Sequence, residues 1–312
     1  MPRPAALWAV VVCYNGGPLL RNCLESLFRS TTPATVVVVD NGSTDGSVEL
    51  IQREFPAVQL VRSAENLGFG RANNDGIRLA LHGGAEHVFL LNQDAWVEPD
   101  TLSHLVALSR QHPELGVVSP VHLNADGTAL DHGFANYLRA DRCPGFISDL
   151  YVRRLRDHYT LPFVNAAAWL LPRNCLEKAG GFNPVFFMYG EDVDLCHRVR
   201  FHGFRIGVVP AAVIYHARGR AAAPAAGTPM SKSERTKQEA VDLALLSDIN
   251  HSLARQLLTF AGQTLYGVLG PSGGRAGFWA GKWNVVKRIP RLGRLRRRCK
   301  RPAGAFLTEP AH

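Results

Sequence analysis

The chain has 312 residues, of which 46% are hydrophobic, so it can bury one large core and perhaps an appended helical unit. The formal net charge is +9, and the six cysteines lack the spacing of a zinc site, so we expect reduced, mostly buried thiols. The short apolar run near the N-terminus has no small-residue cleavage site, and no apolar run reaches 18 residues. These features argue against a signal peptide and a membrane span, and they lead us to expect a cytoplasmic protein.

Apolar runs that begin near residues 7, 35, 58 and 87 predict four β-strands, with a helix-sized gap between each pair. In the first gap, one predicted helix face is apolar and consists of Leu19, Leu20, Cys23, Leu24, Leu27 and Phe28. Strands that alternate with helices are typical of βαβ units. We therefore predict the α/β class, with a mostly parallel, Rossmann-like sheet flanked by helices and followed by a helical extension.

The second run carries a carboxylate to the end of its strand. Asp40 follows four valines, and Asn41-Gly42 predicts a sharp turn after it. We expect Ser43 or Ser47 to cap the next helix. Ligands bind at this edge of open α/β sheets. Asp40 therefore either accepts hydrogen bonds from a ligand or belongs to an ordinary strand-to-helix turn.

The next two strands also end in polar sequence. Glu65-Asn66-Leu67-Gly68-Phe69-Gly70-Arg71-Ala72-Asn73-Asn74 follows the third strand, and Asn92-Gln93-Asp94 follows the fourth. The carboxyl ends of parallel strands meet at one edge, so these groups should lie together. Residues 68–73 contain two of the three glycines of the dinucleotide fingerprint and lack the third. This argues against a nicotinamide-dependent oxidoreductase.

A second chemical centre is expected near residue 190. Glycines and an aromatic run lead into Glu191, Asp192 and Asp194, which open a predicted helix. Acids in a first helical turn can simply complement the helix dipole, and Asp194 is expected to serve the fold. His216 comes after the predicted strand Ile206–Val209 and the stretch Ala211–Tyr215, where a lone histidine is either structural or a ligand.

The C-terminal third has a different composition. Residues 219–230 are rich in Ala, Gly and Pro and predict a flexible loop, and Ser231 with Glu234 matches a capping box that opens a helix. The apolar stripe of this helical extension is expected to pack on the preceding α/β domain or on a second protomer, giving a homodimer, and a membrane-facing role is the second explanation. It comprises Val241, Leu245, Ile249, Leu253 and Leu257.

The segment Lys287–Arg301 contains nine Lys or Arg residues and no acid. Its nine positive charges equal the formal net charge of the whole chain, +9. Apolar residues recur among these cations at helical spacing, at Val286, Ile289, Leu292 and Leu295. A basic amphipathic segment indicates binding to an anionic membrane surface. A solvated tail and attraction to nucleic acid are the alternatives, and we expect no nucleic-acid partner.

Four segments, taken in chain order, resemble the successive motifs of family 2 inverting glycosyltransferases with the GT-A fold. They are Tyr14-Asn15-Gly16, Asp40–Ser47, Glu65–Asn74 and Leu90–Asp94. The rhamnosyltransferase-like branch is the most similar, and Gly180–Arg198 is similar to the acceptor-site segment of the family. The resemblance implies a GT-A catalytic domain at 1–218, with its nucleotide-sugar half at about 1–100 and its acceptor half at about 101–218. Residues 219–230 would be a loop or lid, and 231–312 the helical extension.

The resemblance also implies roles for single residues. Asp192 corresponds to the catalytic base that deprotonates the acceptor hydroxyl, with Glu191 beside it. Asp94 and His216 would hold a divalent cation, Mg²⁺ or Mn²⁺, although Asn92 replaces the first acid of the family's D-x-D motif and would weaken that site. The implied nucleotide-sugar-binding residues are Tyr14, Asn15, Asp40, Asn66, Arg71, Asn73, Asn92, Gln93 and Asp94.

These implications lead us to expect an inverting glycosyltransferase. It would move rhamnose or another hexose from a dTDP- or UDP-sugar to a saccharide or lipid-linked saccharide acceptor in surface polysaccharide synthesis, at the inner face of the cell membrane. The first alternative is a catalytically silent nucleotide-sugar-binding or scaffold protein. A sugar-nucleotide pyrophosphorylase would need a glycine-rich, Arg-containing loop after its first strand, and residues 13–17 do not supply one. The basic tail is expected to be removable without loss of donor binding.

Overall fold

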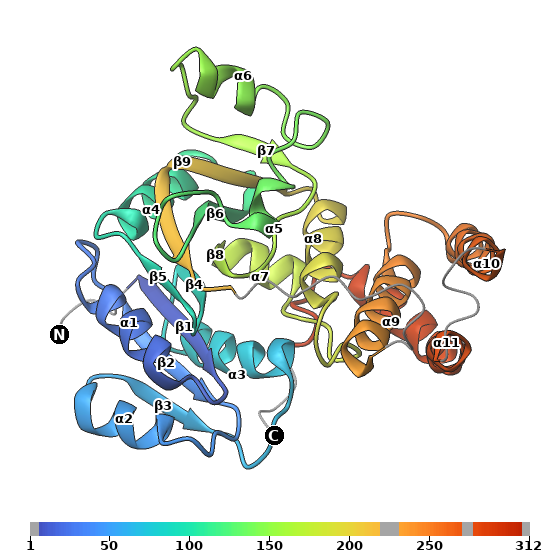
Figure 1. The fold of residues 1–312 in the computed structure, drawn as a ribbon, viewed down its shortest axis with the longest axis horizontal. Helices are drawn as coiled ribbons and strands as arrows, with labels where there is room; N and C mark the ends of the chain where they lie inside the picture. The colour runs from blue at the N-terminus through green and yellow to red at the C-terminus, as the bar shows by residue number, and fades with distance from the viewer. Residues whose placement is uncertain (1–5, 219–230, 270–276, 308–312) are drawn as a thin grey trace.

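The computed structural model describes residues 6–218, 231–269 and 277–307, so the predicted loop at 219–230 lies outside the described residues. One mixed sheet forms the centre of the described chain (Figure 1). Its strands are β1 (Leu7–Cys13), β2 (Thr35–Asp40), β3 (Gln59–Arg62), β4 (His87–Asn92), β5 (Ala95–Val97), β6 (Leu115–Asn124), β7 (Tyr159–Leu161), β8 (Ala168–Pro172) and β9 (Arg205–His216). The helices are α1 (Gly17–Phe28), α2 (Ser47–Glu54), α3 (Phe69–His82), α4 (Thr101–Gln111), α5 (His132–Ala135), α6 (Phe146–Tyr151), α7 (Arg173–Ala179), α8 (Glu191–Phe201), α9 (Lys232–Ser247), α10 (Leu253–Leu269) and α11 (Phe278–Cys299).

The four predicted strands are present and parallel, in the order β3-β2-β1-β4. The order continues as β8-β6-β9-β5, with β8 antiparallel to both neighbours and β7 paired with β9. The central strands are apolar on both faces because helices cover both: α3, α7 and α8 contribute to one buried cluster, and α1, α2 and α4 to the other. The α/β prediction is confirmed, and the ends of β1, β2 and β4 lie side by side.

Two local predictions about the first helices are wrong. Neither serine caps α2: the cap position is Gly46, with φ of 86°, and no side chain bonds there. Instead, the Ser43 hydroxyl accepts a hydrogen bond from the backbone of Asn15. Phe28 lies off the buried face of α1 and is 45% exposed, stacked on Phe55. Loop-to-loop contacts therefore take the hydroxyl groups that a local capping rule would assign to the helix.

The C-terminal helices have their own small core. The capping box at Ser231 and Glu234 is present, but α9 ends at Ser247, so the predicted single stripe is divided between α9 and α10. Val241 of that stripe is 59% exposed. Leu245 and Leu257 of the stripe pack against a buried cluster, and Ile249 is buried beside it. The cluster consists of Val185, Phe186, Leu243, Ala244, Leu246, Phe260, Val285 and Leu292.

The basic helix α11 turns its apolar side inward. Leu292 is fully buried in that cluster, and Ile289 and Leu295 pack against it. Lys282 forms a buried ion pair with Asp242 (Nζ to Oδ2, 2.8 Å). Three residues of the predicted stripe therefore pack inside the protein, whereas Val286 is 38% exposed, and membrane binding by this segment stays a prediction.

The residues after α11 return to the catalytic domain. The carbonyl of Ala305 accepts a hydrogen bond from the Gly181 amide at 2.9 Å, and the carbonyl of Cys299 contacts Nε2 of His202 at 2.9 Å. Phe306 is buried. All six cysteines are buried and unpaired, as expected. Among the helices of the described residues, none is long and apolar enough to span a membrane.

Candidate active site

A cavity of about 240 Å³ opens at the ends of β1 and β4. Its floor is polar and comes from strand ends, whereas Phe69 and Met188 supply apolar walls from α3 and from the segment before α8. The lining residues are Val12, Tyr14, Asn41, Asn66, Phe69, Asn92, Gln93, Asp94 and Met188. Five of the predicted nucleotide-sugar residues therefore lie together in one cavity: Tyr14, Asn66, Asn92, Gln93 and Asp94.

Hydrogen bonds hold the polar walls of this cavity in place. The Gln93 amide bridges the backbone of Tyr14: its Oε1 accepts from the amide at 2.9 Å, and its Nε2 donates to the carbonyl at 3.1 Å. Asn41 donates to Asn66 Oδ1 at 3.0 Å and accepts from the amide of Leu67 at 2.8 Å. Sequence reasoning missed Asn41 as a cavity residue, although its place directly after Asp40 was a usable signal.

Four predicted residues do not line the cavity. Asp40 is 2% exposed and accepts from the Ser43 amide at 3.2 Å, so it closes its own turn. The side-chain Oδ1 of Asn15 accepts from the Thr44 amide at 2.9 Å and joins two loops. Asn73 is buried and donates back to the Phe69 carbonyl at 3.0 Å.

Arg71 is the fourth of these residues. Its guanidinium donates to the Pro184 carbonyl at 3.3 Å, so it contacts the predicted acceptor segment and lies outside the cavity lining. In α3, successive side chains point in directions 100° apart, so only some residues of a helical motif can face one ligand. The sequence motif contains ligand-facing and structural positions that the letters alone do not separate.

At the acidic end of the cavity, Asp94 contacts a buried histidine that lies between two carboxylates. Nε2 of His216 lies 3.4 Å from Oδ1 of Asp94, and its Nδ1 lies 3.6 Å from Oδ2 of the buried Asp131 without a hydrogen bond. Burial opposes ionisation of Asp94, but the contact with His216 outweighs it and holds the pKa of Asp94 below its ordinary value. Asp131 was not predicted.

This arrangement fits a divalent cation. Two ligand atoms of one six-coordinate ion are about 3 Å apart, close to the separation of the Asp94 and His216 atoms. With Nε2 on a metal, the Nδ1–H would face Asp131, and a carboxylate in that position orients metal-bound histidines. The buried Oδ1 of Asn92, a residue that lines the same cavity, has no hydrogen-bond partner in the described chain.

Two carboxyl groups open α8. The Asp192 carboxylate accepts from the amides of Val193 and Ala166, yet burial prevails and raises its pKa to about 6. Burial, and then the charge of Asp192, raises the pKa of Glu191 to about 8. Near neutral pH, Asp192 is therefore mostly ionised and Glu191 mostly protonated, so only Asp192 can accept a proton.

Asp194 serves the fold, as expected. It forms a buried ion pair with Arg198 (Nε to Oδ2, 2.8 Å) and accepts from Asn183. A structural ion pair therefore accounts for Asp194, whereas Glu191 and Asp192 open the same helix with raised pKa values.

Arg218 links the two acidic centres. Its positive charge lowers the pKa of Asp94 and also that of Asp192, so it lies within electrostatic range of both. Tyr137 is the second group that sequence reasoning missed. Burial and the Asp192 charge raise its pKa to about 12. Neither residue belongs to a repeated or strand-end motif, so no sequence pattern identified them.

The acceptor segment is tied to the cavity through α3. The side-chain amide of Asn74 bonds both the amide and the carbonyl of Phe182, at 2.7 and 2.8 Å. The Phe69 amide donates to the Phe187 carbonyl at 3.2 Å. At Gly68, φ is 85°, and a Cβ would lie 2.2 Å from that carbonyl, so glycine permits this approach.

Comparison with known proteins identifies the family. The sequence model of the protein family "Glycosyl transferase family 2" matches residues 8–179 of the chain. The chain belongs to this family. A similar protein is the N-acetylglucosaminyl-diphospho-decaprenol L-rhamnosyltransferase of Mycobacterium tuberculosis, 28% identical over 228 residues that cover 66% of this chain and 74% of the relative. The low-salt glycan biosynthesis hexosyltransferase Agl10 of Haloferax volcanii is 27% identical, covering 64% of this chain and 62% of the relative.

Solved structures share the fold at low identity. S. aureus TarS 1-349 has a TM-score of 0.56 at 16% identity, covering 80% of this chain and 68% of that one. The mannosyltransferase PcManGT of Pyrobaculum calidifontis, in complex with GDP-Man and Mn²⁺, has a TM-score of 0.55 at 19% identity, covering 99% and 89%. The chain thus has the GT-A fold and is a rhamnosyltransferase-like family 2 glycosyltransferase.

Proposed function

We propose that this glycosyltransferase is an inverting enzyme that moves rhamnose or another hexose from a dTDP- or UDP-sugar to a saccharide or lipid-linked saccharide in surface polysaccharide synthesis. The observation that carries the proposal is the pairing of two features: a cavity lined by Asp94, whose carboxylate contacts the buried His216, and a carboxyl group at Asp192 with a pKa of about 6. The name of the mycobacterial relative, which specifies a rhamnosyl donor and a diphosphate-linked acceptor, supports the choice of substrates.

Asp192 would act as the base. An acceptor hydroxyl is a weak nucleophile near neutral pH, and a carboxylate with a pKa of about 6 is ionised and can take its proton. The hydroxyl oxygen attacks the anomeric carbon as the bond to the nucleotide breaks, and attack on the opposite face inverts the configuration. Glu191, protonated at the same pH, would donate a hydrogen bond to the acceptor without competing for its proton.

The nucleotide side would be held by the cavity residues. Asn41, Asn66, Asn92 and Gln93 present amide groups suited to the base and sugar hydroxyls. Asp94 and His216 would hold Mg²⁺ or Mn²⁺, which neutralises the charge that develops on a departing diphosphate. Arg218 adds a fixed positive charge that acts on both carboxylates.

The same proposal places the protein in the cytoplasm, peripherally at the inner face of the cell membrane. The exposed side of α11 supports it: Trp279 and Trp283 are 57% and 59% exposed, one helical turn apart, and the Lys287 ammonium lies over the Trp283 ring. Exposed tryptophans beside cations are typical of membrane interfaces. A homodimer remains a prediction.

A panel of nucleotide sugars tests the function. Purified protein is incubated with dTDP-rhamnose or UDP-hexoses, Mg²⁺ or Mn²⁺, and N-acetylglucosamine linked through diphosphate to a short prenyl chain. NMR of the product then reports the anomeric configuration. Transfer with inversion is expected. Retention would refute the single displacement, and tight donor binding without transfer to any acceptor would favour the silent nucleotide-sugar-binding alternative.

A further inference from the structure

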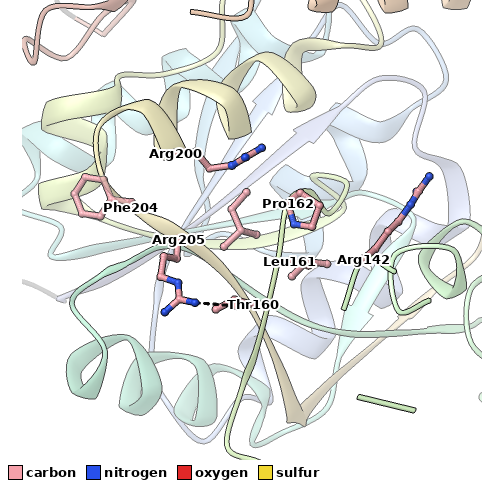
Figure 2. Close-up of a pocket in the computed structure, with 8 residues that line it drawn as sticks. Arg142, Thr160, Leu161, Pro162, Arg200, Phe204 and Arg205 are labelled. Atoms are coloured by element: carbon pink, nitrogen blue, oxygen red, sulfur yellow. Dashed lines mark hydrogen bonds between the residues drawn. The ribbon is translucent and has the colours of Figure 1, made fainter. Parts of the chain in front are cut away.

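A second cavity, of about 390 Å³, lies at the C-terminal end of α8, and three arginines line it together with apolar residues and Thr160. Arg142 and Arg200 lie on either side of Pro162, and Arg205 turns toward Thr160, to which it donates at 3.2 Å (Figure 2). None of the described lining residues is acidic. Three guanidinium groups without a carboxylate among them favour a ligand with several negative charges.

Helix α8 runs from Asp192, the proposed base, to this cavity. Asp192, Cys196 and Arg200 are spaced four residues apart, so they lie along one side of α8. Arg200 lies about 12 Å further along the helix axis than Asp192. One sugar ring and its diphosphate form a chain of comparable length.

The segment before β8 runs along the same side of α8 in the opposite direction. The Ala166 amide bonds the Asp192 carboxylate, Val164 bonds Cys196 through its backbone, and Pro162 lines the arginine cavity with Arg200. Tyr137 gives an independent link, because the charges of Asp192 and of Arg142 both act on its hydroxyl. The arginine cavity and the Asp192 carboxylate therefore lie against one segment, residues 162–166, and none of the residues that line this cavity belongs to the nucleotide-side cavity.

Beyond Arg142, the chain forms a protrusion with exposed apolar side chains. α6 stands above β7 and projects from the sheet (Figure 1). Tyr151 is 88% exposed, and the other large exposed apolar residues there are Ile147, Leu150, Val152 and Leu155. Water-exposed apolar groups in this number mark a contact surface, and the neighbouring exposed Arg153 and Arg154 add positive charge to it.

We propose that the arginine cavity binds the diphosphate of a lipid-linked acceptor, with the saccharide reaching Asp192 and the lipid chain leaving along α6. The proposal rests on the proposed function and names the part of the acceptor that this chain recognises. Two arginines would clamp the diphosphate, while the apolar side chains of α6 contact the prenyl chain and the bilayer that holds it.

Two acceptors separate diphosphate recognition from sugar recognition: N-acetylglucosamine on a short prenyl diphosphate, and the same sugar as an alkyl glycoside. Arg142→Gln and Arg200→Gln are each expected to raise KM for the diphosphate acceptor about tenfold, as expected for loss of a charge-assisted hydrogen bond. KM for the alkyl glycoside and for the donor should stay unchanged. Arg110→Gln, on the exposed side of α4, is the matched control.

Equal KM values for wild type and both cavity variants with the diphosphate acceptor would overturn the proposal while leaving the transferase function intact. If the wild type transfers no sugar, calorimetry with the prenyl diphosphate alone still decides the question. With EDTA present to remove metal from the nucleotide cavity, the wild type should bind it and the variants should not. Binding of inorganic pyrophosphate as tight as the prenyl diphosphate would assign the cavity to a free anion and refute the role of α6.

The apolar surface is tested separately with Leu150→Ser and Tyr151→Ser combined. This variant should transfer normally to the short, water-soluble acceptor, because it leaves the arginines in place. It should transfer several-fold more slowly to a long-chain acceptor in vesicles. Equal loss with both acceptors would show a folding defect and overturn the assignment of α6 to the lipid chain.

Discussion

Replacing Asp192 by Asn is the sharpest test of the proposed mechanism. A pKa of about 6 leaves roughly nine-tenths of Asp192 ionised at pH 7, and an amide cannot take the acceptor proton. General base catalysis contributes roughly 10²–10⁴-fold, so kcat/KM for the acceptor should fall by about that factor. Asp192 does not line the nucleotide cavity, so the Kd for the donor, measured by calorimetry, should be unchanged.

The pH profile tests the same residue independently. As pH rises through about 6, Asp192 loses its proton, so kcat/KM for the acceptor should increase about tenfold from pH 5 to pH 7 and then level off. Glu191→Gln should keep this limb, because Glu191, with a pKa of about 8, is already neutral over that range. Arg218→Gln should move it to higher pH, because the lost cation favours the ionised form of Asp192. Transfer by Asp192→Asn near the wild-type rate, or with the limb at pH 6 intact, would refute Asp192 as the base.

Three further predictions follow from the site and the fold. Asp94→Ala and His216→Gln should each weaken UDP binding about tenfold or more with Mn²⁺ present and leave it unchanged in EDTA, and equal loss in both conditions would remove them from the metal site. Gly68→Ala should weaken donor binding because its Cβ would displace Phe187, whereas Gly46→Ala, with a similar φ but nothing within 4 Å, should cost only about 1–2 kcal/mol of unfolding free energy, measured by denaturation, and leave donor affinity intact. Trp279→Ser with Trp283→Ser should reduce cosedimentation with anionic vesicles several-fold while leaving donor binding unchanged, and unaltered cosedimentation would argue against this side of α11 as the membrane contact.

The strand-end chemistry was predictable because burial imposes a simple pattern. A strand buried on both faces is continuously apolar, so the first polar residues after it mark the sheet edge. This reasoning correctly located Tyr14, Asn92 and Asp94. It could not separate Asn41, which lines the cavity, from the adjacent Asp40, which closes a turn, because their roles depend on side-chain direction and not on sequence position.

Such patterns do not identify site residues that come from distant segments of the sequence. Asp131 caps the short helix α5, and only the pairing of β6 with β9 brings it to His216. Arg218 follows the end of β9, where no predicted motif included it. Arg142 and Arg200 are 58 positions apart, and they line one cavity with Pro162 of the segment before β8. Each case depends on long-range packing, for which a single sequence carries no signal.

The basic helix shows how one amphipathic pattern fits two environments. The spacing of Ile289, Leu292 and Leu295 indicates an apolar side, but lipid and a neighbouring helix satisfy it equally well. Here α9 and the catalytic domain cover that side, and the Arg296 guanidinium donates to the carbonyl of Leu246 at 2.8 Å. Deleting the chain from Val286 onward would therefore expose the cluster around Leu243 and Leu292 and remove the contacts of Ala305 and Phe306 with the acceptor segment. Loss of vesicle binding by such a truncation would report unfolding as readily as lost charge, so only substitutions on the exposed side of α11 can decide whether this helix binds a membrane.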